Sequence, residues 1–261
     1  MLHCKSHLSQ TRICQAAHFG EHLVEGFFRI ESSAGLLTRH TNQVRPFRHR
    51  EETVTESMLG QLNAHYADVV TVETFGAVAE NDVGADWLWI LHFGSKLVPM
   101  LVQAKKIDRA WAGVNDWAIE INTEQQATLE STASEWNVAA QFCFYAPLWH
   151  GHEPCFGPHR PAFMHLGPSA AITTARIQAH DWGVMKHMVP FTCLCCCSDN
   201  AEDAGELLSI SRQKMYPLDE TVNRDSDLSI NAELERMLNR ARESRHVAGS
   251  VVLKMGVGNR E

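Results

Sequence analysis

The segment from Gly84 to Ile107, GADWLWILHFGSKLVPMLVQAKKI, constrains the fold of this chain more than any other. Two apolar runs flank the turn-like HFGSK, a pattern typical of a β-hairpin with buried strands. Yet Asp86 opens the first run, and Gln103 and Lys105 lie inside the second. Burying an amide or an ammonium group without a partner costs several kcal/mol, so we expect the strand to keep these groups for a reason.

The alternation of side chains along a strand predicts where these polar groups point. Gln103 and Lys105 are two residues apart, so they share a face with Leu101. Pairing within the hairpin is expected to bring the Asp86 carboxylate close to them. The opposite face of the first strand is left to apolar side chains, Trp87, Trp89 and Leu91.

The elements around the hairpin predict an α/β fold. Apolar residues at helical spacing predict a helix that begins after His49, and VVTVETFGAV (69–78) is typical of a strand. A second helix is expected over EQQATLESTASEWNVAAQ (124–141), followed by an aromatic strand, FCFYAPL (142–148), that Pro147 stops. Residues 50–148 are therefore expected to run α-β-β-β-α-β.

The rest of the chain gives weaker patterns. We expect a short helix around residues 16–28, a loop over 110–122, a helix over 170–180 and a buried strand over 189–197. Leu, Met and Ala at helical spacing predict a closing amphipathic helix over 229–246.

These patterns suggest a division into an N-terminal extension (1–45), a core (46–198), and a polar linker with a C-terminal helical segment (199–261). Among the 261 residues, 44% are hydrophobic and 21% charged, as in ordinary globular proteins. A net charge of −8 argues against a surface that binds nucleic acid everywhere, although it allows a local basic groove. The start MLHCKSHLSQ has no apolar signal-peptide region, so we expect a cytoplasmic protein with its eight cysteines reduced.

The polar trio of the hairpin resembles the active site of the PD-(D/E)XK nuclease superfamily, in the Mrr-like variant where glutamine replaces the second acid. GADW supplies the aspartate and VQAKK supplies Q-x-K. The predicted α-β-β-β-α-β order, a mixed sheet flanked by helices, also matches the restriction-endonuclease-like core. Together with the helix that opens on glutamines and FCFYAPL, these motifs look like an uncharacterised bacterial family of nuclease-fold proteins, over roughly residues 50 to 200.

This resemblance implies a Mg²⁺ or Mn²⁺ site. Asp86, the Gln103 side-chain oxygen and the Ala104 carbonyl would bind the ion, since it prefers hard oxygen ligands. Lys105 would activate the attacking water or stabilise the negative charge that develops on phosphorus. Glu56, on the first helix, would hold the ion through a water molecule.

Substrate binding is assigned to Gln125 and Lys106. Gln126 is an alternative to Gln125, which fits the spacing to Leu129 and Ala133 better. The expected activity is hydrolysis of phosphodiester bonds in DNA by a metal-dependent endonuclease. The resemblance suggests a defence role against foreign DNA, and cutting of both strands would favour a homodimer. No membrane partner is expected, because the sequence has no run of eighteen apolar residues.

Each of these interpretations has a structural alternative. Thr53-x-x-Glu56 also fits a capping box, and Glu51 or Glu52 would replace Glu56 if the helix begins earlier. The lysine pair would otherwise mark a solvated strand end, and Asp86 a turn.

Two other functions remain open. One is an inactive nuclease-fold protein that binds nucleic acid or a partner protein, because the neutral Gln103 weakens the metal site. The other is a zinc-stabilised interaction protein built on segments rich in cysteine and histidine. The candidate ligands, whose spacing is unlike that of known zinc sites, are Cys4, His7, Cys14, His18, His150, His152, Cys155, His159, His165 and Cys193–Cys197. Finally, Arg236, Arg240, Arg242 and Arg245 could track phosphates, but interspersed glutamates favour a solvated helix face.

Overall fold

The structure of the chain is a computed structural model. It describes residues 11–41, 50–75, 84–94, 96–106, 108–109, 117–148, 162–178, 182–198, 200–217, 227–244 and 247–255.

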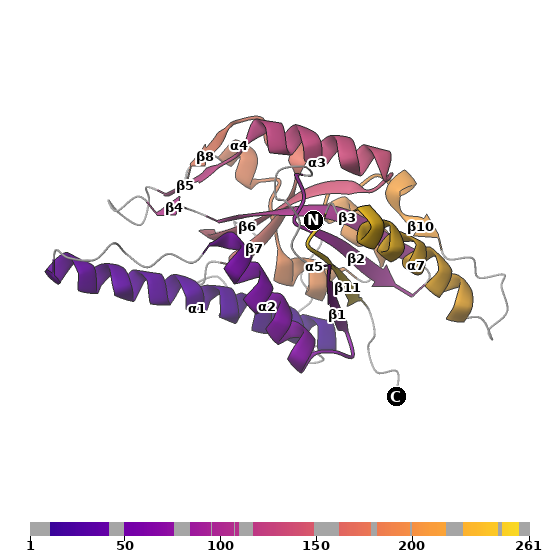
Figure 1. Cartoon of the computed structure of the whole chain (residues 1–261), viewed down its shortest axis with the longest axis horizontal. Coiled ribbons are helices and arrows are strands. Elements are labelled where there is room, and N and C mark those ends of the chain that lie inside the picture. The colour runs from indigo at the N-terminus through magenta and orange to yellow at the C-terminus, as the bar shows by residue number, and fades with distance from the viewer. Residues whose placement is uncertain are drawn as a thin grey trace.

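Helices and strands are interspersed along the described chain (Figure 1). The α-helices are α1 (Arg12–Thr41), α2 (Glu51–His65), α3 (Thr123–Glu135), α4 (Trp182–Met185), α5 (Phe191–Cys197), α6 (Ala201–Leu207) and α7 (Asp227–Ser244). The strands are β1 (Val70–Thr74), β2 (Trp87–Phe93), β3 (Lys96–Lys106), β4 (Asp108–Arg109), β5 (Trp117–Glu120), β6 (Ala139–Leu148), β7 (Ala162–Pro168), β8 (Arg176–Gln178), β9 (Val189–Pro190), β10 (Tyr216–Pro217) and β11 (Gly249–Lys254). Short 3₁₀ turns occur at Ser169–Ala171 and Arg212–Lys214.

The described residues form one large mixed sheet and one small sheet. The large sheet has 8 strands, in the order β1-β11-β2-β3-β6-β7-β9, with β10 paired to β3. Strand β11 runs parallel to β2, and β3 runs parallel to β6, whereas the other neighbours in this sheet are antiparallel. The small sheet consists of β4, β5 and β8.

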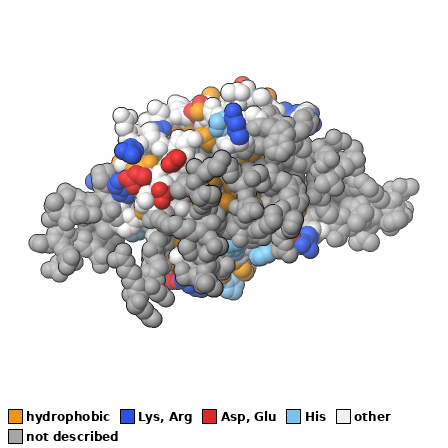
Figure 2. All heavy atoms as spheres, turned by 180° about the vertical axis from the view of Figure 1, so that it is seen from behind, with side chains coloured by type: hydrophobic (Ala, Val, Ile, Leu, Met, Phe, Trp, Pro, Cys, Tyr) orange, Lys and Arg blue, Asp and Glu red, His pale blue; other side chains and the backbone are white. Residues whose placement is uncertain are grey.

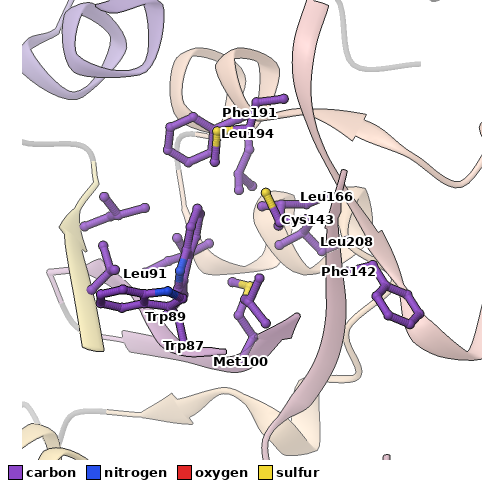
Figure 3. Close-up of a cluster of buried hydrophobic side chains, with 14 of the residues drawn as sticks. Trp87, Trp89, Leu91, Met100, Phe142, Cys143, Leu166, Phe191, Leu194 and Leu208 are labelled. Carbon is purple, nitrogen blue, oxygen red and sulfur yellow. The ribbon is translucent and has the colours of Figure 1, made fainter. Parts of the chain in front are cut away.

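Helices cover both faces of the large sheet. Figure 1 shows α3 along one face and α1 with α2 along the other. Helix α5 packs on the same side as α1, where the ring of Phe191 meets that of Trp89 edge-on, with centroids 5.6 Å apart. Figure 3 shows Trp89 directed toward Phe191 and Leu194, with Met100 and Cys143 beside them. Burial of this cluster joins the hairpin to α5.

The predicted α/β class, with a mixed sheet flanked by helices, is confirmed. The hairpin is also confirmed, because β2 pairs antiparallel with β3 from Trp87 opposite Val102 to Phe93 opposite Lys96. The helix after His49, the strand near Val70, the second helix and the closing helix all form as expected. None of the described helices has an apolar stretch long enough to cross a bilayer.

Several local expectations are wrong. Residues 189–197, predicted as a strand, form only the short β9 and then helix α5. Phe191, Leu194 and Cys195 are the reason, since their burial at spacings of three and four residues follows a helical period. Within 170–180 the predicted helix is replaced by strand β8, and the predicted loop contains its partner β5, because pairing between distant segments overrides local propensity.

Two other elements extend further than expected. Helix α1 runs from Arg12 to Thr41 and is longer than the predicted 16–28. Strand β6 begins at Ala139, inside the predicted second helix, which ends at Glu135, and it is not stopped at Pro147, since it continues to Leu148 with an irregular register after Tyr145.

The C-terminal segment contributes a central strand that we did not predict. Strand β11 lies between β1 and β2, although it comes after the polar stretch that suggested a separate segment from residue 199. Gly249 is required there, because a Cβ on this residue would lie 2.3 Å from the Glu73 carbonyl oxygen and 2.4 Å from the Trp87 ring. The large sheet is therefore completed by a strand that follows the last helix in sequence.

Val251→Ala tests the role of β11. Val251 is completely buried at the centre of this strand, so the variant is expected to lower the free energy of unfolding by about 2 kcal/mol. Thr71→Ala, in the neighbouring strand but exposed, is the control and should cost less than about 1 kcal/mol. Urea denaturation measures both. Equal, small effects would mean that β11 is not part of the folded sheet.

Candidate active site

The polar groups of the hairpin meet at one end of the large sheet. Asp86 lies just before β2, and its backbone N–H donates to the Val102 carbonyl at 2.9 Å. The Ala104 N–H donates in turn to Asp86 Oδ2 at 2.6 Å. This double link orients the carboxylate toward the segment of β3 that carries Gln103 and Lys105, so the predicted approach of Asp86 to these residues is seen in the structure.

Gln125 joins this group from helix α3. Its Oε1 accepts hydrogen bonds from Gln103 Nε2 and from Lys105 Nζ, both at 3.3 Å. The side chain of Asn122 caps the helix by accepting from the Gln125 N–H at 3.2 Å, which sets Gln125 in the first turn. Gly84 lets the hairpin approach this turn, because a Cβ there would lie 2.2 Å from the Gln125 carbonyl oxygen.

The structure also separates Gln125 from its neighbour Gln126. Gln126 Nε2 donates to the carbonyl oxygens of Ser169 and Ile172, each at 2.9 Å. Gln126 therefore ties α3 to the turn after β7, and the preference for Gln125 in the polar group agrees with the geometry.

Helix α2 supplies a carboxylate to the group, but from Glu51 rather than from the expected Glu56. Glu51 Oε1 lies 3.6 Å from Lys105 Nζ, and Oε2 accepts from the Lys106 N–H at 3.2 Å. The helix begins at Glu51, after Arg50, so the capping box starting at Thr53 does not form. Glu56 is exposed, because five residues turn the helix by about 140°. The structure thus brings Glu51, named above as an alternative for an earlier helix start, into the polar group and leaves Glu56 outside it.

Lys106 does not join this group. Its ammonium nitrogen lies 5.4 Å from the centre of the Phe28 ring of α1, on the side of the sheet opposite to Lys105. The role of Lys106 in substrate binding stays a prediction, with the side chain on the other face of the sheet from Lys105. Its backbone N–H contacts the group through Glu51.

Burial and neighbouring charge both act on the carboxyl groups of this site. The pKa of Asp86 is raised to about 7, mainly by burial and also by the negative charges of Glu51 and Glu52, while the Ala104 N–H and Lys105 oppose this rise. Burial also raises the pKa of Glu51, and Lys105 partly opposes this rise. Three carboxyl groups near one ammonium leave an excess of negative charge, which a bound cation would neutralise.

Two oxygen atoms of the site have no hydrogen-bond partner among the described residues. They are Gln103 Oε1 and Glu52 Oε2, and both are buried. An unsatisfied buried acceptor costs free energy unless water or a cation contacts it. Asp86, Gln103, Glu51 and Glu52 thus form an oxygen-rich set that fits Mg²⁺ or Mn²⁺. Ala104 contributes its N–H to Asp86, and the predicted role of its carbonyl stays a prediction.

Of the cysteine and histidine residues proposed as zinc ligands, three come together elsewhere in the fold. Cys14 and Cys196 form a disulfide, and His18 Nε2 lies 3.8 Å from Cys196 Sγ. The expectation that every cysteine is reduced is therefore wrong in this structure. His165 is buried on β7 outside this group. Cys193, Cys195 and Cys197 lie on α5 but outside this group. The remaining zinc candidates fall outside the described residues, as does Arg245: Cys4, His7, His150, His152, Cys155 and His159.

The arginines of α7 pair with carboxylates. Arg236 bonds Glu233, Arg240 bonds Glu135 at 3.0 Å, and Arg242 bonds Glu73 at 2.6 Å. Figure 2 likewise shows acidic and basic side chains intermixed on the described part of the rear face. These pairs agree with the solvated helix face that the sequence favours over a phosphate track.

Asp86→Asn tests the electrostatics of the site through the pH dependence of stability. Because the Asp86 pKa is raised to about 7, the folded state holds its proton more tightly than the unfolded state, where the pKa is near ~3.9. Its contribution to stability is complete below about pH 4 and is lost as pH rises through 7. Asparagine cannot ionise, so the variant should gain about 2 kcal/mol relative to wild type between about pH 5 and 8.

Denaturation with EDTA present at both pH values measures this gain. Asp68→Asn is the control, because Arg12 lowers the pKa of Asp68 and this carboxyl is ionised throughout the range. A stability difference between Asp86→Asn and wild type that does not change with pH would contradict the raised pKa.

Comparison with known proteins adds a family to this description. No curated protein and no solved structure matches the chain. Residues 30–254 match a family described as a family of unknown function (DUF6615). The match covers more than half of the chain and includes the hairpin, Gln125 and the start of α2. The chain therefore belongs to the family of unknown function DUF6615.

Proposed function

We propose that this chain is a metal-dependent nuclease that hydrolyses phosphodiester bonds in DNA. One observation carries the proposal: Asp86, Gln103 and Lys105 converge at one sheet end with Gln125 and Glu51. An acid, an amide oxygen and an ammonium group in this arrangement suit the binding of a divalent ion and of a phosphate beside it. The resemblance of GADW and VQAKK to the Mrr-like nuclease motif supports the same activity.

The ion would be held by residues that present oxygen atoms to the site. Asp86 would use the carboxylate, and Gln103 would use Oε1, which has no partner in the described part of the chain. Glu52 Oε2 likewise has no hydrogen-bond partner among the described residues. Glu51 lies in the same helix turn and faces Lys105. When bound, Mg²⁺ or Mn²⁺ would act as a Lewis acid on the scissile phosphate.

Lys105 is the residue through which the protein would act on the phosphate. Its side chain is 11% exposed and is held between Glu51 and Gln125, so the ammonium position is preset before substrate arrives. An ammonium group in a poorly hydrated site stabilises negative charge on phosphoryl oxygens far better than one in water. Gln125 orients Lys105 and Gln103 together, because one oxygen accepts from both.

Asp86 and Glu51 would also take part in proton transfer. Burial raises the pKa of both carboxyl groups, to about 7 for Asp86, so Asp86 can exchange a proton with water close to neutral pH. A cation would favour the ionised forms of both, and activity is accordingly expected to rise with pH across neutrality.

Lys105→Met and Lys106→Met form a matched pair, since these neighbours lie on opposite faces of β3. Lys105→Met is expected to lower the rate of DNA cleavage by roughly a hundredfold or more, and Lys106→Met by less than about threefold. The assay follows plasmid and single-stranded DNA with Mg²⁺ or Mn²⁺, and EDTA should abolish cleavage in wild type. If Lys105→Met still cleaves DNA, the cleavage comes from a contaminating nuclease and the proposal is rejected. If the wild-type protein binds DNA without cutting it, the result supports the inactive nuclease-fold alternative.

Glu51→Gln and Glu56→Gln decide which glutamate of α2 takes part. Glu51→Gln removes the charge beside Lys105 and is expected to reduce cleavage by roughly tenfold or more, because the lysine loses its orienting partner. Glu56→Gln should leave the rate unchanged, since this side chain is exposed. Rates are compared at several Mg²⁺ concentrations. A larger loss of cleavage rate in Glu56→Gln than in Glu51→Gln would instead assign the metal-holding role to Glu56, as the sequence predicted.

A further inference from the structure

We propose that Cys14, His18 and Cys196 form a second metal site, in which two thiolates and an imidazole hold a soft divalent ion such as Zn²⁺ and join α1 to α5. The site is used when the two cysteines are reduced. It is separate from the proposed nuclease centre and does not depend on it.

The three side chains converge where the two helices pack. Their ligand atoms, Cys14 Sγ, Cys196 Sγ and one imidazole nitrogen of His18, all lie within 4.8 Å of one another. The Cα atoms of the two cysteines are 4.9 Å apart, although 182 residues separate them in sequence. Tertiary packing alone therefore assembles this group.

The backbone holds these ligands in place. Cys14 and His18 are four residues apart on α1, which puts them on one face of the helix. Further along that face, buried Glu21 accepts from the Phe163 N–H of β7 at 2.7 Å, and Val24 is completely buried. Because this face is anchored to the sheet, α1 presents Cys14 and His18 to α5 with little freedom, and such preorganisation favours a metal site.

The ligand types and the exposure both suit a metal ion. Two sulfurs and one imidazole nitrogen match the preference of zinc, with bonds of about 2.3 Å to sulfur and ~2.0 Å to nitrogen. In a tetrahedral site these lengths separate the two sulfurs by about 3.8 Å, so the sulfurs, which are bonded to each other in the disulfide, move apart when the reduced group takes up the ion. Cys14 is buried, whereas His18 and Cys196 are partly exposed, so an ion can enter and water can complete the coordination.

The disulfide and the metal site exclude each other. Cleavage of the Cys14–Cys196 bond takes two electrons and two protons. A dithiol supplies both and becomes a disulfide, whereas a phosphine supplies the electrons, takes up the oxygen of a water molecule as phosphine oxide, and leaves the two protons of that water to the thiols. Each thiol then releases its proton when it binds the ion. In the reverse direction, a peroxide takes two electrons from the two thiolates and is reduced to water with two protons from solvent. The disulfide forms again and the ion leaves.

The test measures zinc bound to the full-length chain. Protein reduced with a phosphine without oxygen is mixed with zinc sulfate and gel-filtered, and the zinc retained per chain is measured by mass spectrometry. We expect about one ion per reduced chain, and none after treatment with hydrogen peroxide. Replacement by Co²⁺ should give absorption from thiolate-to-cobalt charge transfer. Zinc that is absent from reduced wild type, or that stays after oxidation, would overturn the proposal.

Variants separate the metal from the disulfide. Cys196→Ser should abolish both, whereas His18→Ala should keep the disulfide and weaken zinc binding by roughly tenfold or more. Cys193→Ser, on the same helix but outside the group, and Asp86→Asn should bind zinc as wild type does. Thermal unfolding checks that each variant folds. Unchanged zinc affinity in His18→Ala, or a loss in Cys193→Ser without a loss in Cys196→Ser, would overturn the three-ligand site.

Discussion

The antiparallel pairing of β2 with β3 is the constraint on which the candidate site depends. It sets Asp86 beside the Gln103–Lys105 stretch, and the Ala104 N–H then fixes the carboxylate at 2.6 Å. A slip of one residue in this register would turn Gln103 and Lys105 to the face covered by α1 and α2 and place apolar side chains in the site. The rings of Trp87 and Trp89, buried on that face, make such a slip costly because they would have to exchange places with polar groups.

The first turns of two helices supply the other residues of the polar group. Glu51 and Gln125 lie in the first turns of α2 and α3, and both contact Lys105. Carboxylates are favoured at helix N-termini, where backbone N–H groups are free to interact with negative charge. A buried ammonium needs such partners, since removing one of them leaves a charge without compensation. The same arrangement therefore makes Lys105 tolerable in the fold and suitable for contact with a phosphate.

Much of the hairpin and of its polar group could be predicted from sequence, because strand alternation is a local property. The alternation correctly placed Gln103 and Lys105 on the same face of the strand, and helical spacing favoured Gln125 over Gln126 for the polar group. The choice between Glu56 and Glu51 could not be made from sequence, because Lys105 and the Lys106 N–H, which contact Glu51, come from another part of the chain. Residues 189–197 failed because their apolar composition suits either a strand or a buried helix.

By itself, the sequence determined the α/β class, the hairpin and the polar side chains at its open end, since these follow from periodicities within a few residues. Only the tertiary structure decided that β11 enters the sheet between β1 and β2, and that Cys14 meets Cys196 across 182 residues. It also decided which glutamate of α2 faces Lys105. The physical reason is the same in each case: the partners are distant in sequence, and contacts of this kind are selected by packing of the whole core rather than by local propensity.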